Sequence, residues 1–448
     1  MERILLNKFL PFIISPKLFI PLNQTDMIMK TRILFFMLVI TFVGELSAQD
    51  ASEYVTIRGV VKDFRNHKDL ENVCVSLSGT NKGTVTNKDG AFSLKVINKD
   101  KNIQINFSHL GYLTEKLIVN NFEKKNNKHI VYLRQIALPL KEVIVTPIDA
   151  QKIVEEAMSK VTVNYPNHPT MLTAFYRETI RKKKHYISVC EAVIKIYKTS
   201  YTNGNDSRER VRILKGRKIL SQNLCDTLSV KLQGGPTQGT ALDLVKTAWP
   251  LLEEENLGWY KFSFVEYTVI DGRFYYKIHF EPIVERLFPL MSGNYYIDRE
   301  TLAFERMELL TDMRDNYKVT EQVLAKKPIG MRFNPQELSY LISYKTVGPK
   351  TYLNYIRSTL RFQCDWKRKM FHTNYVVVAE TAVTDREDNP TENIHYRNAF
   401  RIGNVLSDKI ENFQDSDFWQ GYNIIEPTES LEDAVVKLKK NTLKSKDH

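Results

Sequence analysis

The 448-residue sequence is poor in the residues that hold small or metal-bound proteins together. Its four cysteines are far apart and form no C-x-x-C pair and no Cys/His spacing of the zinc-binding type. They are Cys74, Cys190, Cys225 and Cys364. Several disulfide pairings are compatible with this number, so both disulfides and buried free thiols remain open. With 18 glycines and 16 prolines, the chain has no low-complexity or collagen-like segment.

The sequence also lacks the motifs of the common catalytic sites. It contains no glycine-rich phosphate loop, no G-x-S-x-G elbow and no H-E-x-x-H motif, and its nine histidines are scattered. His279 lies between Ile278 and Phe280 in a strand-like stretch, so we interpret it as a structural strand histidine rather than a metal ligand or a general base. We therefore predict no catalytic, cofactor-binding or metal-binding residue and no cofactor.

A few charged motifs allow two interpretations. Arg177 and Glu178 could bind an anion, but an ion pair across neighbouring strands is the simpler interpretation. Asp89 precedes a glycine and indicates a hairpin turn rather than a calcium loop, because no further carboxylates follow at the required spacing. The acidic runs at residues 253–255 and 385–388 are interpreted as solvated loop charge.

Lysine and arginine total 64 against 52 acidic residues, which gives a formal net charge of +12. Nucleic-acid binding would require this charge to be concentrated on one face. Here it is spread, and the short basic runs at residues 181–184 and 367–369 each lie between two apolar stretches. We interpret both runs as solvated hairpin turns and predict no nucleic-acid partner.

An apolar run at residues 33–43 follows the positive charges of Lys30 and Arg32. This pattern is typical of a secretory signal peptide, here residues 29–48, with cleavage between Ala48 and Gln49. The run is too short to span a bilayer, so no permanent membrane span is predicted. The preceding residues 1–28 are apolar without periodicity, and we predict that they are a non-native extension, with translation starting at Met29. The mature protein is then expected to be periplasmic or associated with the outer membrane.

Residues 50–146 alternate apolar and polar side chains in short stretches that are separated by turn residues. This pattern predicts a small β-sandwich. Its motifs are I-x-G-x-V-x-D at residues 57–63, GTVTN-x-DG-x-F at residues 83–92 and L-x-EV-x-V at residues 140–145. With these motifs the segment resembles the carboxypeptidase-regulatory-like domain. That resemblance implies a transthyretin-like sandwich, common in exported Bacteroidetes proteins, that corresponds to a non-catalytic appendage of metallocarboxypeptidases.

Residues 148–430 are expected to form a larger β-rich domain of unknown function. Asp149 is placed to cap an opening helix, and a second short helix is predicted at residues 240–248. Strand patterns dominate after Ala174, including a hairpin that turns at residues 298–301. A final helix with a basic tail is expected at residues 431–448, where Ser430 begins a capping-box pattern.

The hairpin pattern around residues 298–301 is similar to that of periplasmic lipoprotein carriers, whose curved sheet encloses acyl chains. Other stretches resemble an uncharacterised Bacteroidetes family that carries the same N-terminal module. They are residues 174–178, 191–193 and 417–427. The second resemblance implies no assigned activity.

The predicted fold class is mainly β, with an N-terminal transthyretin-like sandwich followed by a larger antiparallel β-rich domain with a few helices. The predicted function is that of an exported, non-enzymatic binding or envelope-interaction protein, which could recruit a partner through an exposed strand edge. Its unknown partner would be an envelope protein, a glycan or a lipid. Two alternatives remain: a lipid or lipoprotein carrier with an apolar cavity, and a hydrolase with an unrecognised site.

Overall fold

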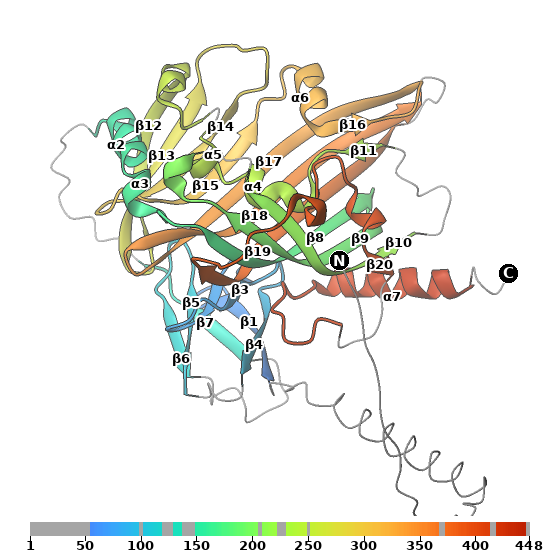
Figure 1. Ribbon diagram of the computed structural model, residues 1–448, viewed down its shortest axis with the longest axis horizontal. Coiled ribbons are helices and arrows are strands. Elements are labelled where there is room, and N and C mark those ends of the chain that lie inside the picture. Colours follow the sequence, from blue (N-terminus) through green and yellow to red (C-terminus); the bar gives the residue numbers. More distant parts are fainter. Residues whose placement is uncertain are drawn as a thin grey trace, which may run out of the picture. The chain divides into compact units, whose positions relative to one another are not determined.

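The computed structural model describes residues 54–97, 102–118, 129–136, 148–204, 208–221, 230–248, 251–366, 372–412 and 418–444. Strands dominate these residues, and helices are few (Figure 1). The predicted mainly-β fold class, with a large antiparallel sheet, is therefore confirmed. The proposed signal peptide with Ala48 and Gln49, the basic run at residues 367–369 and Cys225 lie outside the described residues.

The N-terminal strands form two small sheets that enclose one apolar core. One sheet has the strand order β4-β1-β7 and the other the order β3-β2-β5-β6. The strands are β1 (Tyr54–Asp63), β2 (Cys74–Leu77), β3 (Gly83–Val85), β4 (Ala91–Ile97), β5 (Gln104–Ser108), β6 (Glu115–Ile118) and β7 (His129–Leu133). Alternate side chains point inward as the period of two predicts, so that Phe92 and Phe107 pack edge to face in the core.

An 11-stranded sheet follows, in the order β12-β13-β14-β15-β17-β18-β19-β8-β9-β10-β20. Every pair is antiparallel except β10 with β20. The strands are β8 (Thr170–Lys182), β9 (His185–Lys198), β10 (Arg210–Leu220), β12 (Tyr260–Ile270), β13 (Arg273–Pro282), β14 (Met291–Asp298), β15 (Phe304–Thr311), β17 (Met331–Val347), β18 (Lys350–Trp366), β19 (Thr373–Asp388) and β20 (Glu411–Asn412). The hairpin predicted around residues 298–301 is confirmed as the β14–β15 connection, where Asp298 Oδ1 accepts from the N–H groups of Glu300 and Thr301.

Short helices and one two-stranded sheet complete this part of the chain. The helices are α2 (Ala150–Ser159), α3 (Val161–Asn164), α4 (Gln238–Ala241), α5 (Leu244–Thr247), α6 (Asn316–Val323) and α7 (Glu429–Lys444). The 3₁₀ turns are η3 (Tyr201–Asn203), η5 (Gly235–Thr237), η6 (Glu254–Trp259), η7 (Tyr396–Asn398) and η8 (Leu406–Asp408). The two-stranded sheet pairs β11 (Lys231–Leu232) with β16 (Leu324–Lys326). Asp149 caps α2 as predicted, since its side chain accepts from the Lys152 N–H.

Three local predictions need correction. The single helix expected at residues 240–248 is two short helices, α4 and α5, which meet around Asp243. The last helix begins at Glu429, and its cap is Thr428, whose hydroxyl accepts from the Leu431 N–H, rather than Ser430. The acidic run at residues 385–388 is the end of β19 and not a loop, because its backbone pairs with the start of β8.

The small sheets pack on one face of the 11-stranded sheet through β3 and the segment at residues 418–426. An apolar cluster joins Val85 to Phe175, Trp419 and Ile425. Backbone carbonyls of the same segment accept hydrogen bonds from both sides. The Thr84 hydroxyl donates to Ile424 O at 2.7 Å, and Arg177 Nη2 donates to Ile425 O, also at 2.7 Å. This segment therefore fixes the small sheets to the large one.

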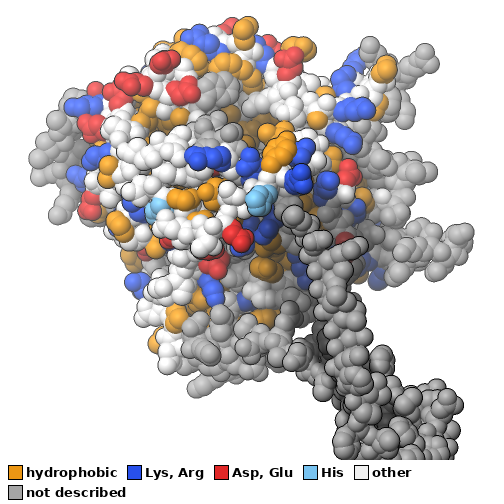
Figure 2. Space-filling model, viewed as in Figure 1, with side chains coloured by type: hydrophobic (Ala, Val, Ile, Leu, Met, Phe, Trp, Pro, Cys, Tyr) orange, Lys and Arg blue, Asp and Glu red, His pale blue; other side chains and the backbone are white. Residues whose placement is uncertain are grey.

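No helix among the described residues is both long and apolar enough to cross a bilayer. On the face drawn in Figure 2, lysine and arginine side chains are distributed among aspartate and glutamate side chains. Of the basic run at residues 181–184, Lys183 and Lys184 form the predicted turn between β8 and β9, whereas Arg181 and Lys182 are the last residues of β8.

Candidate ligand-binding cavity

The 11-stranded sheet carries an open cavity of about 530 Å³ on the face opposite the small sheets. Its floor is formed by β17, β18, β19, β8 and β9. Three segments cover it: residues 230–242, residues 402–408 and the end of α6 at Val323. The volume lies within the range of small-molecule sites, roughly 300–1,000 Å³.

Two rows of side chains cross the floor, because directly paired residues in a sheet point to the same side. One row is apolar, and its paired members are Leu338, Leu360, Val377 and Ile180. The neighbouring row is polar at several positions, and its members are Tyr340, Ser358, Ala379, Glu178 and Cys190. All of these residues line the cavity. The floor is therefore amphipathic, with an apolar side and a polar side.

Glu178 and Cys190 are cross-strand partners in the polar row. The Tyr176 hydroxyl donates to Glu178 Oε2 at 3.0 Å, but burial outweighs this bond and raises the pKa of the carboxyl group. Burial, with the nearby Glu178 carboxylate, also raises the pKa of the Cys190 thiol to about 12. Neither group has the lowered pKa of an activated nucleophile.

Gln238, in the first turn of α4, faces the floor from the covering segment. Its Nε2 donates to Ser358 Oγ at 2.6 Å, whereas its Oε1 is buried and has no hydrogen-bond partner. The residue is 9% exposed. A buried acceptor without a partner costs about 1–3 kcal/mol, so it marks a position where a ligand donor would be favourable.

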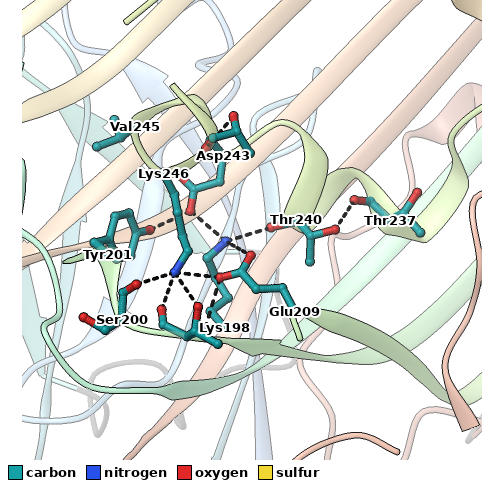
Figure 3. Close-up of polar contacts among 12 residues, drawn as sticks. Lys198, Ser200, Tyr201, Glu209, Thr237, Thr240, Asp243, Val245 and Lys246 are labelled. Carbon is teal, nitrogen blue, oxygen red and sulfur yellow. Dashed lines mark hydrogen bonds and ion pairs between the residues drawn. The ribbon is translucent and has the colours of Figure 1, made fainter. Parts of the chain in front are cut away.

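A buried ion network holds the α4–α5 cover in place (Figure 3). Lys198 Nζ lies 2.8 Å from Asp243 Oδ2 and 3.2 Å from Glu209 Oε2. Lys246 Nζ lies 2.9 Å from Glu209 Oε1. Asp243 also accepts from the hydroxyls of Tyr201 at 2.6 Å and Tyr344 at 2.9 Å. Two lysines and two carboxylates thus balance one another away from solvent.

The pKa shifts in this network follow from burial and pairing. Burial opposes the charge of Lys198, but the Asp243 and Glu209 carboxylates outweigh it and raise the lysine pKa. Burial lowers the pKa of Lys246, although Glu209 counteracts it. Because breaking a buried ion pair is costly, this network keeps the end of α4 and the start of α5 fixed above the cavity.

A second hollow of about 320 Å³ lies on the opposite face and is lined by basic and acidic side chains. Its arginines are largely paired within the protein. The pairs are Arg357 with Glu71 at 3.3 Å, Arg361 with Glu337 at 2.8 Å and Arg306 with Glu308 at 2.8 Å. Three of the arginines are thus paired with carboxylates, whereas Lys88 and Arg181 also line the hollow.

The charged motifs singled out in the sequence have mostly structural partners. Arg177 forms the predicted cross-strand ion pair, but with Glu191 on β9 at 2.7 Å rather than with its neighbour Glu178. His279 pairs across the strands with Asn294, 3.2 Å away, and is a strand histidine as predicted. Asp89 lies in a hairpin turn, where its N–H bonds to the Asn87 side chain.

Two residues of the cavity were missed in the sequence. Glu178 was considered only together with Arg177, although alternation along a strand places neighbours on opposite faces and could have separated them. Gln238 gives no signal in the sequence, because its unpaired oxygen depends on how the cover meets the floor. The described residues contain no cluster of three or more His, Cys, Asp or Glu side chains arranged to hold a metal.

Comparison with known families identifies the N-terminal module. Residues 57–145 match the model of the CarboxypepD_reg-like domain. This finding confirms the resemblance inferred from the spaced glycine, aspartate and aromatic motifs. The CarboxypepD_reg-like region contains nearly all of β1–β7, and none of its described residues lines the cavity. A comparison with curated proteins finds no match.

Solved structures similar to the chain include a putative outer membrane lipoprotein-sorting protein domain from Vibrio parahaemolyticus, with 8% identity and a TM-score of 0.24 over 55% of this chain and 94% of that one. A LolA-superfamily protein from Nitrosomonas europaea has 12% identity and a TM-score of 0.22 over 57% and 98% of the two chains. A DUF1329-family protein from Desulfovibrio piger has 8% identity and a TM-score of 0.24 over 55% and 95%. Scores this low establish no shared fold, so the function has to be inferred from the cavity itself.

Proposed function

We propose that this protein is an exported, non-enzymatic binding protein that holds the aliphatic chain of an amphiphile in the cavity of its 11-stranded sheet. The observation that carries this proposal is the apolar row of Leu338, Leu360, Val377 and Ile180 on the floor of an open cavity of about 530 Å³. Of the alternatives raised by the sequence, it favours the lipid or lipoprotein carrier.

The physical argument rests on packing. Protein interiors are packed as densely as organic crystals, and unfilled apolar space reduces stability. This cavity is far larger than a packing defect, and its apolar lining includes side chains from the cover as well, among them Leu232, Leu242 and Val323. Burying a methylene group is worth about 0.8 kcal/mol, so an aliphatic chain in this space would bind with useful affinity.

The hydrolase alternative is less consistent with the same geometry. The cavity does contain two neighbouring ionisable groups with shifted pKa values, Glu178 and Cys190. A thiol with a pKa of about 12 has almost no thiolate near neutral pH, however, and among the described lining residues there is no histidine to activate it. The polar row is therefore better suited to binding than to bond cleavage.

The proposed location is the periplasm or the periplasmic side of the outer membrane. It is supported by the signal-peptide pattern at residues 29–48 and by the CarboxypepD_reg-like module. In such a compartment the ligand would be a lipid or the acylated part of a lipoprotein. The N-terminal module would then contribute a surface for an envelope partner rather than part of the cavity.

The test is to purify the mature protein without detergent, identify co-purifying lipids by mass spectrometry and titrate the delipidated protein with the fluorophore N-phenyl-1-naphthylamine. Ala379→Phe, or Val377→Phe if the first variant does not fold, fills the floor and is expected to weaken fluorophore binding about tenfold or more. Leu310→Phe is the matched control, because Leu310 is 48% exposed on β15 and does not line the cavity. A folded cavity-filling variant that binds like the wild type, without any co-purifying acyl species, would refute the proposal.

A further inference from the structure

The cavity has a second property, which concerns the polar end of its ligand. Glu178 is the only acidic residue of the described floor strands that lines the cavity. Its single hydrogen-bond partner among the described residues is the Tyr176 hydroxyl, and no described lysine or arginine forms an ion pair with it. A carboxyl group in mostly apolar surroundings without a cation is unusual, because such charges are normally paired.

The side chains that line the cavity do not share the positive excess of the whole chain. The lining contains the carboxyl groups of Glu178 and Asp408 and the ammonium group of Lys231, whereas the complete sequence carries a formal charge of +12. Lys218, the cross-strand partner of Cys190, adds a second ammonium group beside the cavity, but its Nζ donates to the Ser407 carbonyl in the cover. Glu178 therefore keeps no ion-pair partner among these cations.

A second hydrogen-bond acceptor, Gln238 Oε1, lies near Ser358, two strands away from Glu178. Ser358 and Glu178 belong to the same row and are separated by Ala379 on β19, which corresponds to about 10 Å between their backbones. Above Ser358, Gln238 Oε1 is buried without a partner. Glu178 and Gln238 Oε1 therefore both offer acceptors on this side of the cavity, and a ligand carrying hydrogen-bond donors would satisfy them.

We infer that the amphiphile is cationic: a long-chain primary amine whose ammonium group donates to Glu178 and whose chain lies along the apolar row. Gln238 Oε1 then accepts from a further donor of the ligand, such as a hydroxyl or amide N–H group. This inference rests on the proposed function, because it assigns the polar end of a ligand whose aliphatic part occupies the same cavity. A charge-assisted hydrogen bond in a partly dry site is worth more than a neutral one, so the amine should be preferred over uncharged analogues.

The experiment compares three ligands of equal chain length, n-dodecylamine, 1-dodecanol and dodecanoate, as competitors of N-phenyl-1-naphthylamine at neutral pH and below their micellar concentrations. The wild-type protein is expected to bind the amine about tenfold more tightly than dodecanol and to bind dodecanoate most weakly. Glu178→Gln preserves the shape of the side chain and should remove the preference for the amine over dodecanol. Glu337→Gln, on the opposite face, is the matched control and should retain the preference.

The outcomes separate the two proposals. If neither the fluorophore nor any of the three compounds binds, the proposed function fails, and the inference about the amine fails with it. If all three bind with equal affinity, if dodecanoate binds best, or if Glu178→Gln still prefers the amine, then the cavity binds aliphatic chains but Glu178 does not select a cation. In that case the inference is overturned and the proposed function stands.

Discussion

Arg177 and Glu178 are adjacent in β8, yet they lie on opposite faces of the large sheet and in opposite environments. Arg177 is 3% exposed and fully engaged, with Glu191 on one side and the Ile425 carbonyl on the other. Glu178 faces an open cavity and has one neutral partner. Burial of a charge therefore does not by itself indicate function. The ion pair of Arg177 with Glu191 is satisfied within the protein and stabilises the structure, whereas Glu178 has no charged partner, and we propose that a ligand binds there.

The largest loss of stability is expected on the face of the sheet that carries the Arg177–Glu191 ion pair. Glu191 accepts from Arg177 at 2.8 Å and from Arg217 at 2.9 Å. Glu191→Ala removes the buried carboxylate that both arginines share, so the free energy of unfolding should fall by up to roughly 5 kcal/mol in urea denaturation. A loss below about 1 kcal/mol would show that the network is not structural and would remove the contrast with Glu178.

A somewhat smaller loss of stability is expected when the buried ion network of Lys198, Glu209 and Asp243 is disrupted. Asp243→Asn leaves Lys198 with one carboxylate partner fewer, and we expect a loss of roughly 3 kcal/mol in the free energy of unfolding. Because Asp243 lies between α4 and α5, fluorophore binding in the cavity should weaken as well. Titration at a temperature where the variant is still folded tests this. Unchanged binding would show that the position of the cover does not depend on the network.

Glu178 and Glu191 should also have opposite effects on how the stability of the protein depends on pH. Burial raises the pKa of Glu178, so the folded protein retains this proton above the ordinary value of 4.5, and the carboxyl group reduces stability progressively as the pH rises through its folded pKa. Burial also opposes the charge of Glu191, but Arg177 and Arg217 outweigh it and lower its pKa, so its contribution is present above pH 4.5 and is lost in acid.

Thermal unfolding of Glu178→Gln and the wild type over a range of pH measures this difference. The variant should gain stability relative to the wild type as the pH rises above about 4.5 and lose this advantage in more acidic solution. Glu191→Gln is the matched comparison, and its deficit should instead be largest at neutral pH. Parallel curves for Glu178→Gln and wild type would mean that the cavity does not perturb its carboxyl group.

The smallest change in stability is expected when the hydrogen-bonded pair of Gln238 and Ser358 is removed. Gln238→Leu combined with Ser358→Ala eliminates one hydrogen bond but also the buried oxygen without a partner. Replacing both partners by apolar groups is often nearly neutral, so the free energy of unfolding should change by less than about 1 kcal/mol. A large loss in chemical denaturation would show that the pair is structural, like the network on the opposite face.

Local sequence patterns predicted much of the fold, because strands and turns are determined by near neighbours. Period-two alternation and turn residues located the β14–β15 hairpin and the strands of the N-terminal module, and Asp149 indicated the start of α2. Exact helix starts were less predictable, because Thr428 and Ser430 are both good cap residues and only the structure shows that the Thr428 hydroxyl accepts from the Leu431 N–H.

The cavity could not be predicted in the same way, because it depends on pairing between distant strands. Ser358, Ala379, Glu178 and Cys190 form a row only once β18, β19, β8 and β9 are aligned in register, and a shift by one residue would turn every one of them to the other face. The unpaired oxygen of Gln238 depends in addition on a cover that is fixed by ions from three separate segments. One sequence contains the residues but not these alignments.

The segment at residues 418–426 has a consequence for how the chain is made. Its carbonyls hold the Thr84 side chain of the N-terminal module as well as Arg177 of the large sheet, and the Asn423 side chain accepts from the Lys95 N–H at 2.7 Å. In a nascent or translocating chain, the complete module emerges about 270 residues before this segment does. A chain that ends before residue 418 would keep direct contacts between the module and the sheet, such as Arg357 with Glu71 and Thr114 with Asp271, but would lose every hydrogen bond to this segment.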